Sequence, residues 1–143
     1  MSRTLAREDA FKLIFEMEIT GISASDALEY LYSTVDKANE MWAQHSVSQS
    51  NKNYINTAVL GIEENKEKIN LLIESKLKGW TLNRLSKVNL ALLQLAIYEI
   101  KFMDDIPNKV SVNEAVTLAK KYSNPQAGSF INGVLGTILN EGN

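Results

Sequence analysis

The sequence predicts an all-α protein, a compact bundle of about seven helices in two halves. Apolar residues recur at helical spacing along nearly the whole chain, and no set of strand-like segments is available to form a sheet. Proline, which interrupts helices, occurs only at Pro107 and Pro125. With 143 residues, 45% apolar and 22% charged, the chain is expected to form one domain over residues 1–143 with its own core.

The N-terminal segment is expected to be helical over about 4–19, where apolar residues three and four apart share one face. That face consists of Ala6, Ala10, Leu13, Ile14 and Met17. Thr20-Gly21 then ends the helix, since glycine accepts the left-handed conformation common at helix ends. A second helix is expected to begin near Ser23 or Ser25, where Ser23-x-x-Asp26 offers a cap.

The middle of the chain divides the two predicted halves, about 1–79 and 80–143. Residues 43–52 are polar and serine-rich, which is typical of a linker. A helix is predicted over 53–78, with Gly79 as its stop. Thr81 is expected to cap a short helix over 82–86, and the most apolar stretch, 87–102, is predicted to be the central buried helix.

Two further helices are predicted in the last third of the chain. Ser111-x-x-Glu114 has the pattern of a capping box, so a helix is expected to start there and to run to about Tyr122. Residues 123–126 are expected to form an exit loop. The last helix is predicted over about 127–140 and buries an apolar stripe.

The composition excludes several classes of function. There is no cysteine, and the single histidine, His45, cannot build a multi-histidine metal site. No nucleophile elbow or P-loop occurs, so the chain is predicted to be no enzyme and to need neither cofactor nor metal. No apolar run is long enough for a membrane span, and the N-terminus lacks a signal-peptide stretch, so a cytoplasmic location is expected.

The charge distribution is more informative than its sum. A net charge of −2 argues against a generally basic nucleic-acid binder. Residues 1–7, however, carry Arg3 and Arg7 without any acid. These two side chains, four residues apart, share one helix face, and cations are unfavourable at a helix N-terminus. An anionic ligand would relieve that strain, although ordinary surface charge is an equally good interpretation.

The segment from Lys120 onward gathers basic and aromatic side chains at a helix–loop–helix junction. Lys120, Lys121 and Tyr122 end one predicted helix, and Gln126 and Phe130 follow across the loop. Such a surface suits binding, and nucleic acid is one class of ligand that fits it. Each feature alone has a structural explanation, because lysines are favoured at helix ends and Phe130 also fits a core.

Taken in order, the motifs resemble the NusB family of bacterial transcription antitermination factors. The matching segments are Arg7-Glu8-x-Ala10, Trp80-x-x-x-Arg84-Leu85, Ile106-Pro107-x-x-Val110-x-Val112-Asn113-Glu114-Ala115 and Phe130-Ile131-Asn132-Gly133-Val134-Leu135. The similarity covers essentially the whole length and is most specific in the second half.

The resemblance implies an RNA-binding adaptor that is not an enzyme. Family members bind the boxA element of ribosomal RNA leader transcripts together with NusE, a small-subunit ribosomal protein, and act on the transcription elongation complex. The positions that match the family's RNA-binding residues are Arg3, Arg7, Lys120, Lys121, Tyr122, Gln126 and Phe130. Those expected to meet NusE are Phe15, Arg84, Val88 and Asn89. Some members form homodimers through the face that would meet RNA, and the sequence leaves the oligomeric state open.

The chain departs from the family where many relatives carry a run of arginines. Here Thr4-Leu5 interrupts the run, so RNA binding by the chain alone is expected to be weaker and more dependent on NusE. Reversing the charges of Arg7 and Lys121 is expected to abolish RNA binding without unfolding the domain.

Two other interpretations stay open at the level of sequence. The same helical fold occurs as the N-terminal RNA-binding domain of ribosomal RNA 5-methylcytosine methyltransferases. The chain could instead be a protein-interaction bundle, with the acidic segment 8–40 as its partner face.

Overall fold

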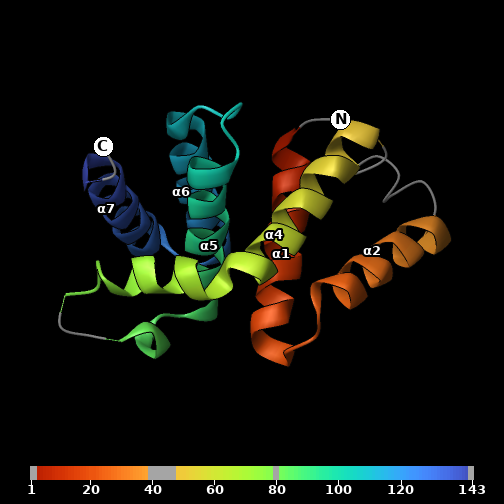
Figure 1. Ribbon diagram of the computed structural model, residues 1–143, viewed down its shortest axis with the longest axis horizontal. Coiled ribbons are helices and arrows are strands. Elements are labelled where there is room, and N and C mark those ends of the chain that lie inside the picture. The colour runs from red at the N-terminus through yellow and green to blue at the C-terminus, as the bar shows by residue number, and fades with distance from the viewer. Residues whose placement is uncertain (1–2, 39–47, 79–80, 142–143) are drawn as a thin grey trace. The chain divides into compact units, whose positions relative to one another are not determined.

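The computed structural model describes residues 3–38, 48–78 and 81–141, which form six α-helices and one short 3-10 helix without any strand (Figure 1). The predicted all-α fold class is therefore confirmed. The chain divides into two compact units, an N-terminal unit (Met1–Glu64) and a C-terminal unit (Asn65–Asn143). Their boundary lies inside the long helix α4 (Gln49–Glu74), earlier than the predicted division near Gly79, because packing and not a helix end separates the units.

The N-terminal unit contains α1 (Arg3–Thr20), α2 (Ala24–Ala38) and the first part of α4. The predicted apolar face of α1 is buried, as expected. Gly21 has a φ of +79°, and its N–H donates to the Met17 carbonyl at 2.9 Å, so α1 ends where the sequence indicated. The Ser23 hydroxyl oxygen accepts from the Asp26 N–H at 3.1 Å, which confirms the predicted cap of α2.

Helix α2 (Ala24–Ala38) is joined to α4 by one hydrogen bond at its first residue and another near its middle. The Ala24 N–H donates to Glu63 Oε2 at 2.7 Å, and the Tyr32 hydroxyl donates to Asn56 Oδ1 at 2.8 Å. Leu28 and Leu31 are buried between these two points. His45 lies outside the described residues.

The prediction of a linker over 43–52 is wrong at its C-terminal end, because α4 already begins at Gln49. The Ser48 hydroxyl oxygen accepts from the Asn51 N–H at 3.1 Å, so this serine caps the helix. Serine and asparagine favour both loops and helix starts, so a segment rich in them does not distinguish the two. The remaining residues of the expected linker, 43–47, lie outside the described residues.

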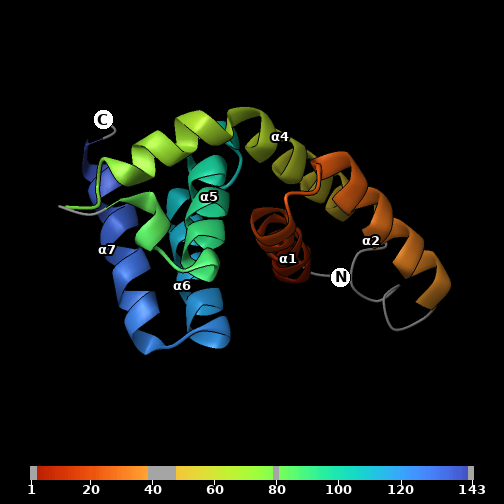
Figure 2. The same cartoon turned by 90° about the horizontal axis from the view of Figure 1, so that it is seen from below.

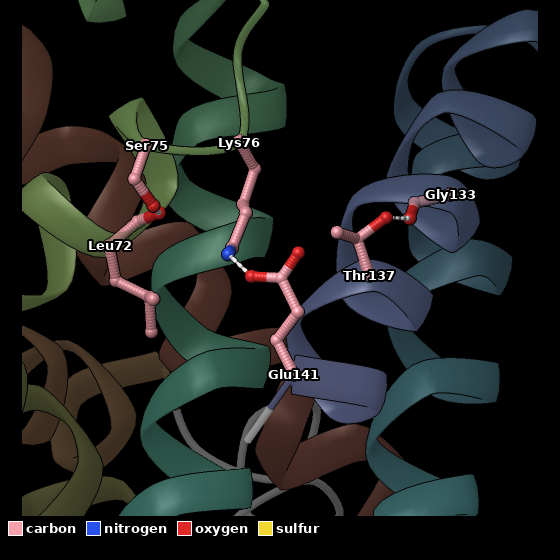
Figure 3. Close-up of polar contacts among 6 residues, drawn as sticks. All are labelled: Leu72, Ser75, Lys76, Gly133, Thr137 and Glu141. Carbon is pink, nitrogen blue, oxygen red and sulfur yellow. Dashed lines mark hydrogen bonds and ion pairs between the residues drawn. The ribbon is translucent and has the colours of Figure 1, made fainter. Parts of the chain in front are cut away.

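Helix α4 ends at Glu74, before the predicted end at 78. The Ser75 hydroxyl donates to the Leu72 carbonyl at 2.6 Å and closes the last turn. Lys76 then forms an ion pair with Glu141 at the end of α7, which fixes the departing chain within the C-terminal unit (Figure 3). Gly79, the expected stop, lies outside the described residues.

The C-terminal unit continues with η1 (Leu82–Arg84), α5 (Lys87–Phe102), α6 (Asn108–Tyr122) and α7 (Pro125–Glu141). Helix α5 has the predicted bounds and is buried continuously from Leu90 to Glu99. Helices α6 and α7 form an antiparallel hairpin whose turn is visible in Figure 2. The short helix is smaller than predicted, and Thr81 precedes it without a side-chain capping bond.

The predicted capping box at Ser111 and Glu114 is wrong. Helix α6 begins three residues earlier, at Asn108 directly after Pro107, so Ser111 lies inside it. The Ser111 hydroxyl donates to Glu99 Oε1 on α5 at 2.7 Å, and both residues are buried. The serine therefore satisfies a carboxylate of a neighbouring helix in place of its own helix end.

The predicted exit loop 123–126 is shorter than expected. Pro125 is the first residue of α7, a position where its missing N–H costs nothing. The Asn124 Oδ1 atom accepts from the Ala127 N–H at 2.8 Å and caps the helix. Gln126 consequently belongs to the first turn of α7.

Candidate nucleic-acid interface

Two arginines of α1 meet one tyrosine of α4 in the N-terminal unit. The Arg3 guanidinium carbon lies 4.7 Å from the centre of the Tyr54 ring, and that of Arg7 lies 5.6 Å from the same centre. Arg3 also donates from Nη2 to Ser50 Oγ at 3.1 Å and from Nε to Asn51 Oδ1 at 3.4 Å. We call Arg3, Arg7 and Tyr54 the arginine cluster. Cation–π contacts and hydrogen bonds together hold Arg3 in one place.

The two arginines differ in exposure. Arg3 is half-buried, whereas Arg7 is 4% exposed and lies beside the buried acidic residues Glu8 and Asp9. A glutamate in place of Arg7 would add a third carboxylate to this buried region. Because Arg7 is buried, we expect that reversing its charge would disturb the fold, which the spacing of the two arginines in the sequence did not indicate.

The α2 and α4 residues around this cluster are not among those predicted from the sequence to bind RNA or NusE. Tyr54 is buried, and the Lys52 ammonium lies 5.7 Å from the centre of the Tyr32 ring. Burial raises the pKa of Tyr32, and the nearby Asp9 carboxylate raises it further. The Ser48-x-x-Asn51 spacing could have revealed the start of α4 and drawn attention to the tyrosine that follows.

A second group of basic and aromatic side chains lies at the tip of the α6–α7 hairpin. Lys120 and Lys121 are exposed in the last turn of α6, and Tyr122 is half-buried beside them. The Lys121 ammonium lies 5.4 Å from the centre of the Tyr122 ring. We call Lys120, Lys121 and Tyr122 the lysine cluster. Gln126 is exposed across the turn, and Phe130 is half-buried about one turn further along α7.

Gly128 determines where the Lys120 side chain lies. A Cβ atom at Gly128 would stand 3.1 Å from both Cγ and Cε of Lys120, closer than ordinary van der Waals contact. The lysine stem therefore passes directly over the glycine, which is buried in the hairpin. Because glycine has no side chain, the stem packs against α7 while the residue remains exposed.

The residues predicted to meet NusE fall into both units. Phe15 is half-buried on α1, with its ring centre 6.1 Å from that of Phe11. Arg84 is exposed in η1, whereas Val88 and Asn89 are half-buried in the first turn of α5. The Asn89 N–H donates to the Ser86 hydroxyl oxygen at 3.1 Å, so Ser86 caps α5. These positions remain predictions.

The predicted RNA-binding residues thus form two local groups. Arg3 and Arg7 belong to the N-terminal unit, and the remaining five belong to the hairpin of the C-terminal unit. Within the residues that the structure describes, no three histidine or acidic side chains are placed to hold a metal ion. None of the described helices has the length and apolarity needed to cross a membrane.

The described residues form an all-α fold with two clusters of basic and aromatic side chains, and exposed groups of this kind suit an anionic polymer. Comparison with known proteins identifies the family. The model of the NusB family matches residues 4–140, and the chain belongs to the NusB family.

Relatives and solved structures agree with this assignment. The transcription antitermination protein NusB of Clostridium novyi (strain NT) is 46% identical over 139 residues, which cover 97% of this chain and 98% of that protein. The structure of T. maritima NusB is similar with a TM-score of 0.82 and 33% identity, over 99% of this chain and 92% of that chain. A crystal structure of the antitermination factors NusB and NusE in complex with double-stranded RNA is similar with a TM-score of 0.81 and 25% identity, over 96% of both chains.

Proposed function

We propose that this protein is a transcription antitermination factor that binds boxA RNA together with NusE and supports elongation through ribosomal RNA operons. It acts in the cytoplasm as an adaptor and carries out no reaction of its own. The observation that carries the proposal is the lysine cluster, whose two exposed lysines and one ring stand together at the hairpin tip. A similar NusB chain has been crystallised with NusE and RNA, which supports the choice of partners.

The RNA-binding mechanism follows from the properties of these side chains. Lys120 and Lys121 bind phosphates, and unstacked bases of single-stranded boxA rest on Tyr122 and Phe130, with each stack contributing about 1–3 kcal/mol. The side-chain amide of Gln126, in the first turn of α7, donates a hydrogen bond to RNA. Its amide carries no negative charge, so it does not repel the phosphate backbone.

In the N-terminal unit, Arg3 is the phosphate ligand and Arg7 holds the arginine cluster in place. Arg3 is half-buried and already oriented by Ser50, Asn51 and Tyr54, so little side-chain entropy is lost when it binds. Arg7 is buried, and its contribution is to hold the Tyr54 ring in place. Few phosphate contacts are available, so RNA affinity depends only modestly on salt. The slope of log affinity against log salt concentration is about −0.7 for each phosphate contact.

The test is a titration of fluorescent boxA RNA with the full chain, with and without NusE, against a scrambled RNA at two salt concentrations. Specific, salt-sensitive binding that tightens with NusE is the expected result. Equal affinity for boxA and scrambled RNA in the presence of NusE would contradict the proposal. Sedimentation of the same samples measures whether a homodimer dissociates when RNA binds.

The alternative interpretations are less well supported. Relatives that match this chain along nearly their full length are antitermination proteins, which favours that function over a methyltransferase domain. A bundle that binds only proteins would retain NusE binding without any boxA preference. The titration therefore separates these cases as well.

A further inference from the structure

The C-terminal unit has a pocket that the proposed RNA surface does not use. Its volume is about 260 Å³, and it lies between the second part of α4 and the C-terminal part of α5. It is lined by Lys68, Ile69, Leu72, Ile97, Lys101 and Phe102. It shares no residue with the lysine cluster, so it can be occupied by a second partner.

The walls of the pocket are apolar and well supported. Ile69 and Ile97 are fully buried beneath it, while Phe102 remains 44% exposed. The Phe102 ring is stacked on Tyr98, with ring centres 4.9 Å apart. Leu71, one residue from the lining, is exposed as well. An exposed aromatic ring held by a stacked neighbour is a preorganised contact for a large apolar side chain.

Two lysines give the pocket its charge. Lys68 and Lys101 are exposed, and they are the only charged residues in the lining. Among the residues that the structure describes, neither ammonium group forms an ion pair or a hydrogen bond. Both ammonium groups are therefore available to a partner, and a partner with carboxylates matches them in charge.

We propose that this pocket docks an acidic peptide segment of a protein partner. One large apolar side chain of the segment enters between Ile69, Leu72 and Phe102, and carboxylates on either side of it pair with Lys68 and Lys101. A nucleotide base fits less well, because its polar edge would lose water in a lining that offers no hydrogen-bond partner apart from the lysines.

The test uses a hexapeptide with leucine and phenylalanine at its centre and two acidic residues on each side. It is titrated into the full chain carrying ¹³C-labelled methyl groups, and NMR follows the methyls of Ile69, Leu72 and Ile97. Saturable shifts confined to these methyls are expected. A peptide with two central alanines, and one with lysines in place of the acids, should each bind more weakly by about tenfold.

Variants of the chain complete the test. Lys68→Glu with Lys101→Glu should weaken binding of the acidic peptide about tenfold, whereas the charge-matched control Lys87→Glu with Lys109→Glu should leave it unchanged. A thermal melt verifies that each variant is folded. Phe102→Ala, at an exposed position, removes one wall and should also weaken binding.

Three results would overturn the proposal. They are the absence of saturable shifts, equal binding of the lysine peptide, and equal binding to both double variants. Decanoate that shifts the same methyls while the acidic peptide does not would assign the pocket to a small amphiphile instead of a protein.

Discussion

The arginine cluster and the lysine cluster contain the same types of group, two cations and a tyrosine, but in opposite environments. Tyr54 is 4% exposed and has a guanidinium near its ring from both Arg3 and Arg7. Lys120 and Lys121, in contrast, are exposed at a helix end, with the half-buried Tyr122 between them and the hairpin turn.

From this difference we expect that a basic–aromatic motif contributes to stability where it is buried and to binding where it is exposed. In the arginine cluster Arg7 and Tyr54 are buried, so removing Arg7 is expected to disturb the fold. In the lysine cluster both lysines are exposed at a helix end, so removing them is expected to cost little stability. Stability and RNA affinity should therefore respond to different substitutions.

The largest effect is expected for Arg7→Ala. Removing a buried arginine beside Glu8 and Asp9 should lower the free energy of unfolding by roughly 2–4 kcal/mol. The matched substitution Arg3→Ala, at a half-buried position, should cost less than about 1 kcal/mol. Urea denaturation of both variants measures the contrast. Equal losses of unfolding free energy would show that burial does not determine how much each arginine contributes to stability.

Replacing Lys120 and Lys121 together by alanine should act in the opposite way. Affinity for boxA RNA should fall about tenfold, and the salt slope should decrease in magnitude by about 1.4, because two phosphate contacts are lost. The free energy of unfolding should change by less than about 0.5 kcal/mol. Lys87→Ala with Lys109→Ala is the control. An equal loss of RNA affinity in this control would show that the effect comes from net charge alone.

Tyr32→Phe should have a smaller effect, and one that depends on pH. Loss of the hydrogen bond to Asn56 should cost about 1 kcal/mol at neutral pH. Because the pKa of Tyr32 is raised in the folded protein, its stabilising effect is complete below the unfolded value near 10 and declines as pH rises above that value. Unfolding measured at about pH 8 and about pH 11 should show the difference between wild type and variant shrink. A constant difference would contradict the role assigned to the hydroxyl.

The smallest effect is expected for Gly128→Ala. The new methyl group would displace the Lys120 stem, so RNA affinity should fall about threefold, although helix propensity alone favours alanine by about 1 kcal/mol. Gly133→Ala is a matched control, because a Cβ there meets no atom within 4 Å. It should stabilise the helix without any change in affinity. Equal affinities for the two variants would mean that the position of Lys120 is unimportant.

The regular parts of this fold could be predicted from local signals. Helix α5 has the predicted bounds, and α1 ends at the predicted glycine. The errors concentrate at serines and asparagines, where one side chain suits a cap, a loop or a tertiary bond equally well. Ser48 proved to be a cap, and Ser111 proved to be a partner of Glu99.

The candidate site could be predicted only in part. Lys120 and Lys121 are exposed at the end of a helix, as their position in the sequence indicated. Tyr54 was missed, because its significance comes from α1 residues far away in the chain. Such contacts depend on packing between helices, which local periodicity does not encode.

The sequence by itself determined that the chain is helical, where most helices lie and which family it belongs to, because periodicity and motifs are local properties of the chain. Only the tertiary structure decided which cations are buried, which serine caps a helix and which glycine makes room for a lysine. These outcomes depend on neighbours distant in sequence, and burial changes the free energy of a charged group by more than its position along the helix does.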